Sequence, residues 1–216
     1  MNIVFDLDGT LIDSAQDICL IVNSILGDLE REALSLDVVR SFIGEGAAVL
    51  ISRVMAARGL SESSGLHEKL LVQFISRYET MAVESPFYPG VSVALDELRG
   101  SGHCLGLCTN KPEGPTRAVM RQSGLDKILD AMIAGGMVDS RKPEPDMLQH
   151  VVKEMGGAPA LYVGDSETDA ETARRAGIPF ALFSGGYRKS PVDDIHHDWV
   201  FDHFDELNGI VERASS

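Results

Sequence analysis

The order of apolar and polar positions divides the chain into segments of two kinds. Residues 2–6, "NIVFD", form a short apolar run with β-branched side chains, which predicts a buried strand. From residue 14 to about residue 83, apolar side chains recur every three or four positions instead, which predicts helices. The clearest stripes consist of Ile18, Ile21, Val22, Ile25, Leu26 and Leu29, and of Leu70, Leu71, Phe74, Ile75 and Tyr78.

Local signals within this helical segment indicate where its helices begin and end. Ser14, followed three residues later by Asp17, resembles a capping box at the start of the first helix. Residues 38–55, "VVRSFIGEGAAVLISRVM", predict a helix, a glycine loop and a second helix. We therefore expect residues 14–83 to be all-helical.

The rest of the chain predicts alternating strands and helices. After a turn-rich hinge at 84–90, "ESPFYPG", strands are expected at 104–109, 131–136, 160–165, 180–183 and 199–201. Amphipathic segments separate these strands, and such alternation indicates a parallel sheet covered by helices on both faces. The expected fold class is α/β, with a Rossmann-like parallel sheet core formed by residues 1–13 and 84–216. A small all-helical cap, residues 14–83, is inserted after the first strand.

Composition narrows the classes of partner. The net charge is −14, from 19 Lys and Arg against 33 Asp and Glu, which argues against nucleic acid or an anionic membrane. No apolar run approaches the roughly 20 residues of a membrane span, and no signal-peptide pattern precedes Asp6, so we expect a cytoplasmic location. Cys19, Cys104 and Cys108 lie in apolar stretches and are expected to be buried free thiols.

Chemically useful side chains lie at the ends of the predicted strands, or just before the helix that leads to one. They are Asp6, Asp8, Thr109, Asn110, Lys111, Lys142, Asp165 and Asp169. In an open α/β sheet, ligands bind beyond the carboxyl ends of the strands, so we expect these side chains to converge. Carboxylates that crowd together need a cation, and an oxygen-only ligand set with room for water favours Mg²⁺.

A phosphoryl group is the natural shared partner of Mg²⁺ and Lys142. A threonine hydroxyl and backbone N–H groups near glycine can complete its binding site. One aspartate can attack phosphorus and form an aspartyl phosphate, while a second donates a proton to the leaving group. The sequence therefore predicts phosphoryl transfer.

These motifs resemble those of the haloacid dehalogenase-like hydrolase superfamily, over essentially the full chain. "DLDGT" is similar to its first motif, Thr109 to its second, Lys142 to its third and "GDSETD" to its fourth. The resemblance implies that Asp6 is the nucleophile and a Mg²⁺ ligand. It implies that Asp8 is the general acid and base, and that its main-chain carbonyl also binds Mg²⁺. Thr109 and Lys142 would hold the phosphate, Asp165 would ligate Mg²⁺, and Asp169 would orient metal-bound water.

Within that superfamily the chain is most similar to phosphoglycolate phosphatases. The similarity lies in "DLDGTLIDS", "FIGEGA", "TNKP", "RKPEPDML" and "GDSETDAETARRAGIP". It implies a small phosphorylated metabolite as substrate, with Asn110 among the substrate contacts. The cap residue Glu45 is also expected to contact the substrate, although it departs from the family pattern, because an acid there would repel the carboxylate of phosphoglycolate. A monomer or a homodimer is expected.

Three other functions share some of these motifs. A phosphosugar mutase of the β-phosphoglucomutase type shares the nucleophile, but such mutases usually carry Glu-Asp where this chain has Gly164-Asp165. A 2-haloacid dehalogenase would not need Asp8 and Gly9 in this form. A phospho-receiver signalling module gathers similar side chains, but it phosphorylates an aspartate on a later strand and has no place for a helical cap.

Two further segments are expected to have structural rather than chemical roles. Residues 184–190, "SGGYRKS", are expected to be a plain connecting loop, although they would reach the active edge of the sheet. His196, His197 and His203 lie in an acidic stretch without regular ligand spacing. We expect a solvated surface there rather than a metal site.

Overall fold

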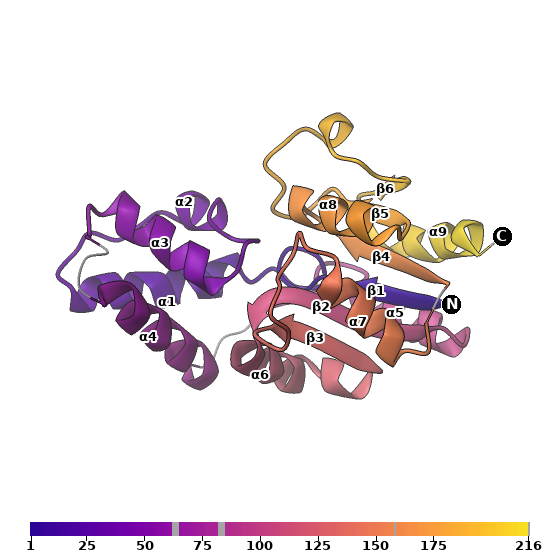
Figure 1. Ribbon diagram of the computed structural model, residues 1–216, viewed down its shortest axis with the longest axis horizontal. Coiled ribbons are helices and arrows are strands. Elements are labelled where there is room, and N and C mark those ends of the chain that lie inside the picture. Colours follow the sequence, from indigo (N-terminus) through magenta and orange to yellow (C-terminus); the bar gives the residue numbers. More distant parts are fainter. Residues whose placement is uncertain (62–64, 82–84, 158, 216) are drawn as a thin grey trace.

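The computed structural model describes residues 1–61, 65–81, 85–157 and 159–215. Its centre is a parallel sheet with the strand order β3-β2-β1-β4-β5-β6 (Figure 1). The strands are β1 (Asn2–Phe5), β2 (Cys104–Pro112), β3 (Ala131–Gly135), β4 (Ala160–Gly164), β5 (Phe180–Phe183) and β6 (Trp199–Phe201). This order is that of doubly wound, Rossmann-like sheets, so the predicted fold class is confirmed.

Helices cover both faces of the sheet. They are α5 (Val91–Gly100), α6 (Glu113–Ser123), α7 (Asp146–Glu154), α8 (Glu167–Ala176) and α9 (Leu207–Ala214), with 3₁₀ turns at Leu125–Lys127, Val192–Asp194 and Phe204–Glu206. Successive side chains of a strand point to opposite faces. Val4 therefore packs with residues of α7 and α8, whereas Ile3 and Phe5 pack with residues of α5, α6 and α9. Burial on both faces explains why Ile3, Val4 and Phe5 form a continuous apolar run rather than an alternating one.

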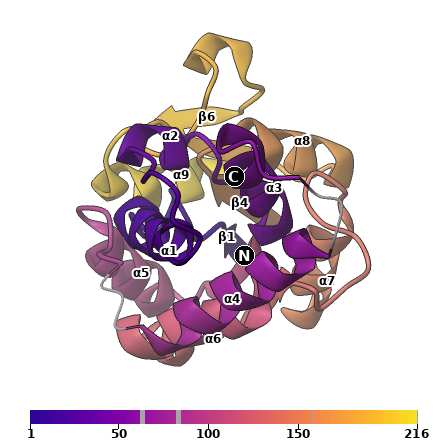
Figure 2. The ribbon, with the colours of Figure 1, turned by 90° about the vertical axis from the view of Figure 1, so that its left-hand side faces the viewer.

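The remaining helices form a separate group beyond the carboxyl ends of the strands (Figures 1 and 2). They are α1 (Ala15–Asp28), α2 (Leu36–Arg40), α3 (Ala47–Ala57) and α4 (Leu66–Thr80), called here the helical lobe. Ile21 and Ile25 of the first predicted stripe are buried, as are Phe74 and Tyr78 of the second. The expected boundary between residues 83 and 84 lies outside the described residues. Among the described helices, none is long and apolar enough to cross a membrane.

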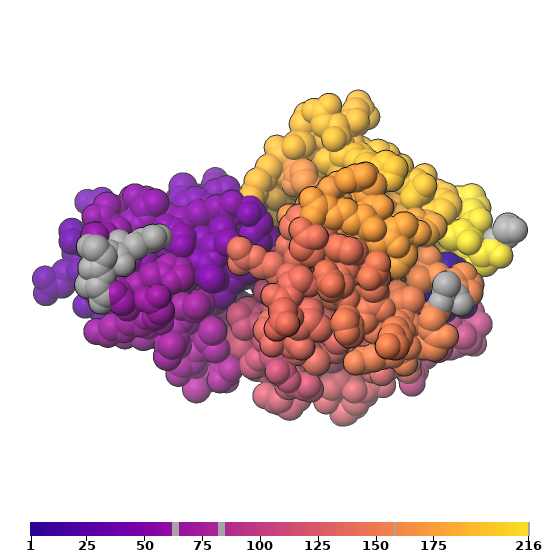
Figure 3. Space-filling view, viewed as in Figure 1, coloured from indigo at the N-terminus to yellow at the C-terminus, as the bar shows by residue number. Residues whose placement is uncertain are grey.

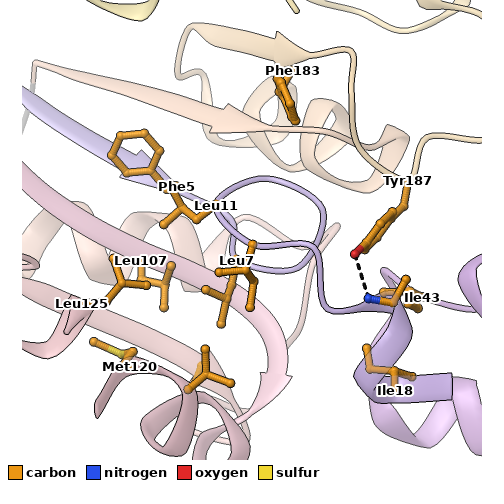
Figure 4. Close-up of a cluster of buried hydrophobic side chains, with 14 of the residues drawn as sticks. Phe5, Leu7, Leu11, Ile18, Ile43, Leu107, Met120, Leu125, Phe183 and Tyr187 are labelled. Carbon is orange, nitrogen blue, oxygen red and sulfur yellow. Dashed lines mark hydrogen bonds between the residues drawn. The ribbon is translucent and has the colours of Figure 1, made fainter. Parts of the chain in front are cut away.

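Two segments that run side by side join the helical lobe to the α/β lobe. The Asp13 N–H donates to the Pro86 carbonyl over 2.9 Å, and the Tyr88 N–H donates to the Leu11 carbonyl over 3.1 Å. One hydrophobic cluster continues from the sheet into the helical lobe, and Figure 4 shows part of it, with Ile18 and Ile43 near Tyr187. The space-filling view shows the two lobes meeting across a narrowed waist (Figure 3).

Two local predictions are wrong. Ser14 precedes α1 but makes no side-chain cap; its hydroxyl donates to Asp8 Oδ1 over 2.6 Å, and Asp17 accepts from Ser85 over 2.5 Å. The Ser14 hydroxyl and the Asp17 carboxylate, which a local capping box would use, form hydrogen bonds outside the helix instead. Cys104 is exposed, because it lies at the first position of β2. Cys19 and Cys108 are buried free thiols, as expected.

Candidate active site

The register of the sheet brings three predicted site residues to one edge. Phe5 of β1 is paired with Leu107 of β2 on one side and with Val163 of β4 on the other. The residues one or two positions beyond this paired row therefore lie together at the centre of the sheet. Asp6, Thr109 and Asp165 are all buried there, between the α/β lobe and the helical lobe.

Asp6, Asp165 and Asp169 form a compact acidic cluster. Each offers a carboxylate oxygen within 4.8 Å of the other two, and this is the one such group of three potential metal ligands among the described residues. Burial, and to a smaller extent the Asp169 charge, raises the pKa of Asp6 to about 7, although Lys142 acts in the opposite direction. Burial and the charges of Asp169 and Asp6 raise the pKa of Asp165 well above its usual value.

Lys142 balances part of this negative charge. Its Nζ lies 2.9 Å from Asp6 Oδ1 and donates to Asp169 Oδ1 over 2.7 Å and to the Tyr162 hydroxyl over 3.0 Å. Burial by itself lowers the pKa of Lys142, but the Asp169 and Asp6 carboxylates outweigh it and hold the pKa above its usual value. The lysine is therefore a permanent buried cation directed at the acidic cluster.

Asp169 is held from every side by its neighbours. Oδ1 accepts from Lys142 and from the Tyr162 hydroxyl, each over 2.7 Å. Oδ2 accepts from the Ser166 N–H over 3.1 Å and from its hydroxyl over 2.5 Å, which forms a capping box at the start of α8. Burial by itself raises the pKa of Asp169. The charge of Lys142 and the hydrogen bonds lower it by a larger amount, so the pKa of Asp169 lies below its usual value. Asp169 remains charged and positions Lys142.

The acidic cluster fits a hard divalent cation. Its donors are all carboxylate oxygens, which suit Mg²⁺ better than softer metals. Oδ1 of Asp6 is buried, and no aligned hydrogen bond reaches it from the described residues, although Lys142 is its ion-pair partner. A bound cation would stabilise this buried oxygen, which lacks an aligned hydrogen bond and lies beside two other carboxylates.

Asp8 lies two residues after Asp6 but has different surroundings. Its Oδ1 accepts from the Ser14 hydroxyl over 2.6 Å and from Lys111 Nζ over 2.8 Å. Lys111 Nζ also donates to the hydroxyl of Tyr78, on α4 of the helical lobe, over 2.6 Å. Sequence reasoning assigned no role to Lys111. It was expected at the end of the predicted strand at 104–109, next to Asn110, and it lies near the end of β2.

Asn110 links three segments at the end of β2. Its side-chain amide donates to the Lys142 carbonyl over 3.1 Å and to the Gly44 carbonyl of the helical lobe over 3.2 Å. Its side-chain oxygen accepts from the Lys142 N–H over 2.9 Å. These bonds position the backbone at Lys142 and connect it to the loop between α2 and α3.

Asp165 is fixed by residues that the sequence analysis did not select. Thr10 donates to Oδ1 over 2.7 Å, and the Tyr187 N–H donates to Oδ2 over 2.6 Å. Residues 184–190 form a connecting loop that reaches the active edge, as expected, and Tyr187 of this loop holds Asp165. Gly9 allows the turn after β1 to lie close to the Asp165 carboxylate. It has a φ of +90°, and a Cβ there would lie 2.5 Å from the Asp165 carboxylate.

Two cavities reach the site, and both are lined by Asp6, Asp8, Ile43 and Gly44. The larger one, called here the interlobe pocket, has about 480 Å³ with its mouth included. Asp6, Asp8 and Lys111 line one side, and Ile18, Leu50 and Phe74 of the helical lobe line the other. The smaller one is lined by Asp165, Glu45 and Lys189, among others.

Glu45 lies at this smaller cavity. It pairs with Arg53 of α3, and Lys189 Nζ is 3.6 Å from the same oxygen. The Arg53 hydrogen bond lowers the pKa of the Glu45 carboxyl. Elsewhere, His203 pairs with Asp205 over 2.8 Å, and His197 contacts the Ile195 carbonyl. Neither belongs to a group of three potential metal ligands among the described residues.

The fold and the acidic cluster define a class of enzyme, and comparison with known proteins supports the same class. Residues 3–183 match the family model of the haloacid dehalogenase-like hydrolases, and the chain belongs to this family. It is 42% identical over 213 residues to a phosphoglycolate phosphatase of Cereibacter sphaeroides, covering 98% of each chain. It is 40% identical to one of Rhodobacter capsulatus, covering 97% of this chain and 96% of the relative.

A solved structure extends the likeness to three dimensions. The crystal structure of a predicted phosphoglycolate phosphatase from Haemophilus somnus superposes with a TM-score of 0.90 and 31% identity. The match covers 97% of this chain and 96% of that one, so both lobes are shared.

Proposed function

We propose that this chain is a Mg²⁺-dependent phosphatase that hydrolyses a small phosphate monoester, with phosphoglycolate as the first candidate substrate. The observation that carries the proposal is the contact between Asp6 and Lys142 inside the acidic cluster. It puts a candidate nucleophile beside a cation that can bind phosphate. Relatives of 40–42% identity over nearly the whole chain are named phosphoglycolate phosphatase, which supports the same activity rather than the mutase alternative.

The proposed reaction has two steps. A carboxylate oxygen of Asp6 attacks phosphorus, the bond between phosphorus and the ester oxygen breaks, and Asp8 gives its proton to the departing oxygen. Water then attacks phosphorus of the aspartyl phosphate, Asp8 takes a proton from that water, and the Asp6 carboxylate is regenerated with release of phosphate. Thr109 and Lys142 bind the phosphoryl oxygens in both steps.

Asp6, Asp165 and the main-chain carbonyl of Asp8 would hold the magnesium ion. Bound there, Mg²⁺ would neutralise charge on the phosphoryl group and on the acidic cluster. Asp169 positions Lys142 through the hydrogen bond between them, and we propose that it also orients water near the metal.

We further propose that residues 14–83 act as a cap over the site, with residues 1–13 and 84–216 as the catalytic core. Tyr78 and Gly44 of the helical lobe contact Lys111 and Asn110 of the α/β lobe, and such contacts suit a lid that excludes water. Asn110 and Glu45 as substrate contacts, a monomer or homodimer, and a cytoplasmic location remain predictions.

Release of inorganic phosphate from phosphoglycolate tests the proposed function. Purified protein should release phosphate with Mg²⁺, lose that activity in EDTA, and regain it when Mg²⁺ is restored. Asp6→Asn should reduce turnover to background, because an amide cannot form the aspartyl phosphate. Asp126→Asn, an exposed acid far from the site, serves as the matched control and should behave like the wild type. Full activity in EDTA, or in Asp6→Asn, would contradict the proposal.

A further inference from the structure

Lys111 is a buried cation for which the proposed reaction gives no role. Its side chain is only 4% exposed, and of the described residues that line the interlobe pocket it alone is positively charged. The opposite wall is apolar and includes Ile18, Leu50 and Phe74. A buried charge facing an apolar wall needs anionic partners, because the interior screens it weakly.

The described residues accept hydrogen bonds from only two of the three donors on Lys111. Asp8 takes one over 2.8 Å and the Tyr78 hydroxyl takes another over 2.6 Å. An ammonium group carries three N–H donors, so one makes no hydrogen bond to the described residues and is available to a ligand, beside the Tyr78 ring, whose centroid lies 3.9 Å from Nζ. The two contacts also fix Nζ in place, since one comes from the α/β lobe and the other from the helical lobe.

The distance to Asp8 limits where a ligand group can bind. In the proposed reaction Asp8 faces the ester oxygen, and Lys111 Nζ lies 2.8 Å from its carboxylate. A substrate group that reaches Nζ must therefore stand only a few bonds away from that oxygen. A carboxylate attached to the carbon that bears the ester oxygen meets this requirement.

We propose that Lys111 binds the carboxylate of a short leaving group and thereby selects phosphoesters of 2-hydroxy acids over neutral esters of the same size. This assignment rests on the proposed phosphatase function. Glu45 does not oppose it, because its carboxylate pairs with Arg53 and lies at the smaller cavity, beside Lys189.

The test compares two esters that differ only in charge. Phosphoglycolate and 2-phosphoglycolamide have the same shape, but the second carries a neutral amide in place of the carboxylate. Wild-type protein with Mg²⁺ should show a kcat/KM ratio of about 10 to 100 in favour of phosphoglycolate, the range of one hydrogen bond to a charged group. A ratio near one, with both esters hydrolysed, would overturn this proposal and leave the phosphatase standing.

Variants then assign the selectivity to one side chain. Lys111→Met should bring the ratio close to one, and Lys111→Arg should restore part of it, because the positive charge returns. Lys127→Met removes an exposed lysine outside the pocket and controls for the change in net charge; its ratio should equal that of the wild type. If Lys111→Met lowered kcat/KM for both esters equally, Lys111 would be a structural residue and the proposal would be wrong.

Failure of the proposed function has a different signature. Wild-type protein that hydrolyses neither ester, nor p-nitrophenyl phosphate, would refute the phosphatase itself and this assignment with it. If Lys111→Met does not fold, the wild-type comparison of the two esters still decides whether the pocket recognises the carboxylate.

Discussion

Asp6 and Asp8 show how two acids in one short motif acquire different surroundings. Asp6 belongs to the acidic cluster and contacts Lys142, whereas Asp8 accepts from Ser14 and Lys111, although both line the interlobe pocket. The chain turns directly after β1, and in this turn Gly9 has a φ of +90° and approaches Asp165. Two carboxylates in different surroundings can serve as nucleophile and as acid and base.

Asp8→Asn should separate the two steps of the reaction. With p-nitrophenyl phosphate the leaving group needs little acid help, so the variant should release a burst of p-nitrophenol and then stall as the aspartyl phosphate. An alkyl phosphate, whose alkoxide leaves poorly, should give no burst. The steady-state rate with p-nitrophenyl phosphate should fall by about 10²–10⁴-fold, the usual contribution of general acid–base catalysis.

Rapid-quench kinetics with mass spectrometry of the protein would measure both the burst and the attached phosphate. Asp13→Asn is a suitable control, because Asp13 lies in the same turn but accepts from the Tyr187 hydroxyl instead of lining the interlobe pocket. Phosphate found on a residue other than Asp6 would overturn the assignment of both aspartates.

At the scale of elements, the end of β2 organises the site. Asn110 bonds to both backbone groups of Lys142 and to Gly44, so one side chain connects β2 with the segment before α7 and with the helical lobe. These bonds are buried or partly buried, and their loss leaves polar groups without partners. The placement of Lys142 therefore depends on a neighbouring strand rather than on its own segment.

Asn110→Ala should lower both stability and turnover. Losing three hydrogen bonds should reduce the free energy of unfolding by about 2–4 kcal/mol, measured by urea denaturation. The kcat for phosphate release should fall as well, because the backbone at Lys142 is no longer held.

Asn23→Ala is the matched control for this prediction. Asn23 of α1 likewise bonds to both backbone groups of one residue: it donates to the Leu34 carbonyl over 2.9 Å and accepts from the Leu34 N–H over 2.8 Å. Asn23→Ala should lower the free energy of unfolding by a similar amount to Asn110→Ala and leave kcat nearly unchanged. Equal losses of kcat in both variants would show that turnover tracks global stability and not the placement of Lys142.

At the scale of the whole molecule, the acidic cluster couples folding to metal binding. Asp6, Asp165 and Asp169 are buried together, and burial raises the pKa values of Asp6 and Asp165. The folded chain therefore holds costly charges that the unfolded chain exposes to water. A cation that binds only the folded state stabilises it by mass action.

Mg²⁺ should therefore raise the melting temperature of the wild type. At a concentration of about 100 times Kd the gain is about 2.7 kcal/mol, which for a chain of this length means a rise of about 5–10 °C. Asp165→Asn should remove the shift, and the exposed Asp126→Asn should keep it. Differential scanning calorimetry with and without Mg²⁺ measures this without any turnover. If Mg²⁺ raised the melting temperature of Asp165→Asn as much as that of the wild type, the metal would bind at another site.

Local pattern was enough to predict much of this molecule. Apolar runs and stripes predicted the strands and the helices of the helical lobe, because burial of each element requires its own periodicity. The rule that ligands bind at the carboxyl ends of parallel strands predicted that Asp6, Thr109 and Asp165 would meet, and the strand register places them together.

Only the tertiary structure decided which side chains contact one another. Ser14 bonds to Asp8 instead of capping α1, Tyr187 fixes Asp165 across 22 residues, and Lys111 joins Asp8 to Tyr78. These partners lie far apart in sequence or compete with local bonds, so no periodicity reveals them. Their choice depends on distances that exist only after the sheet has formed and the two lobes have met.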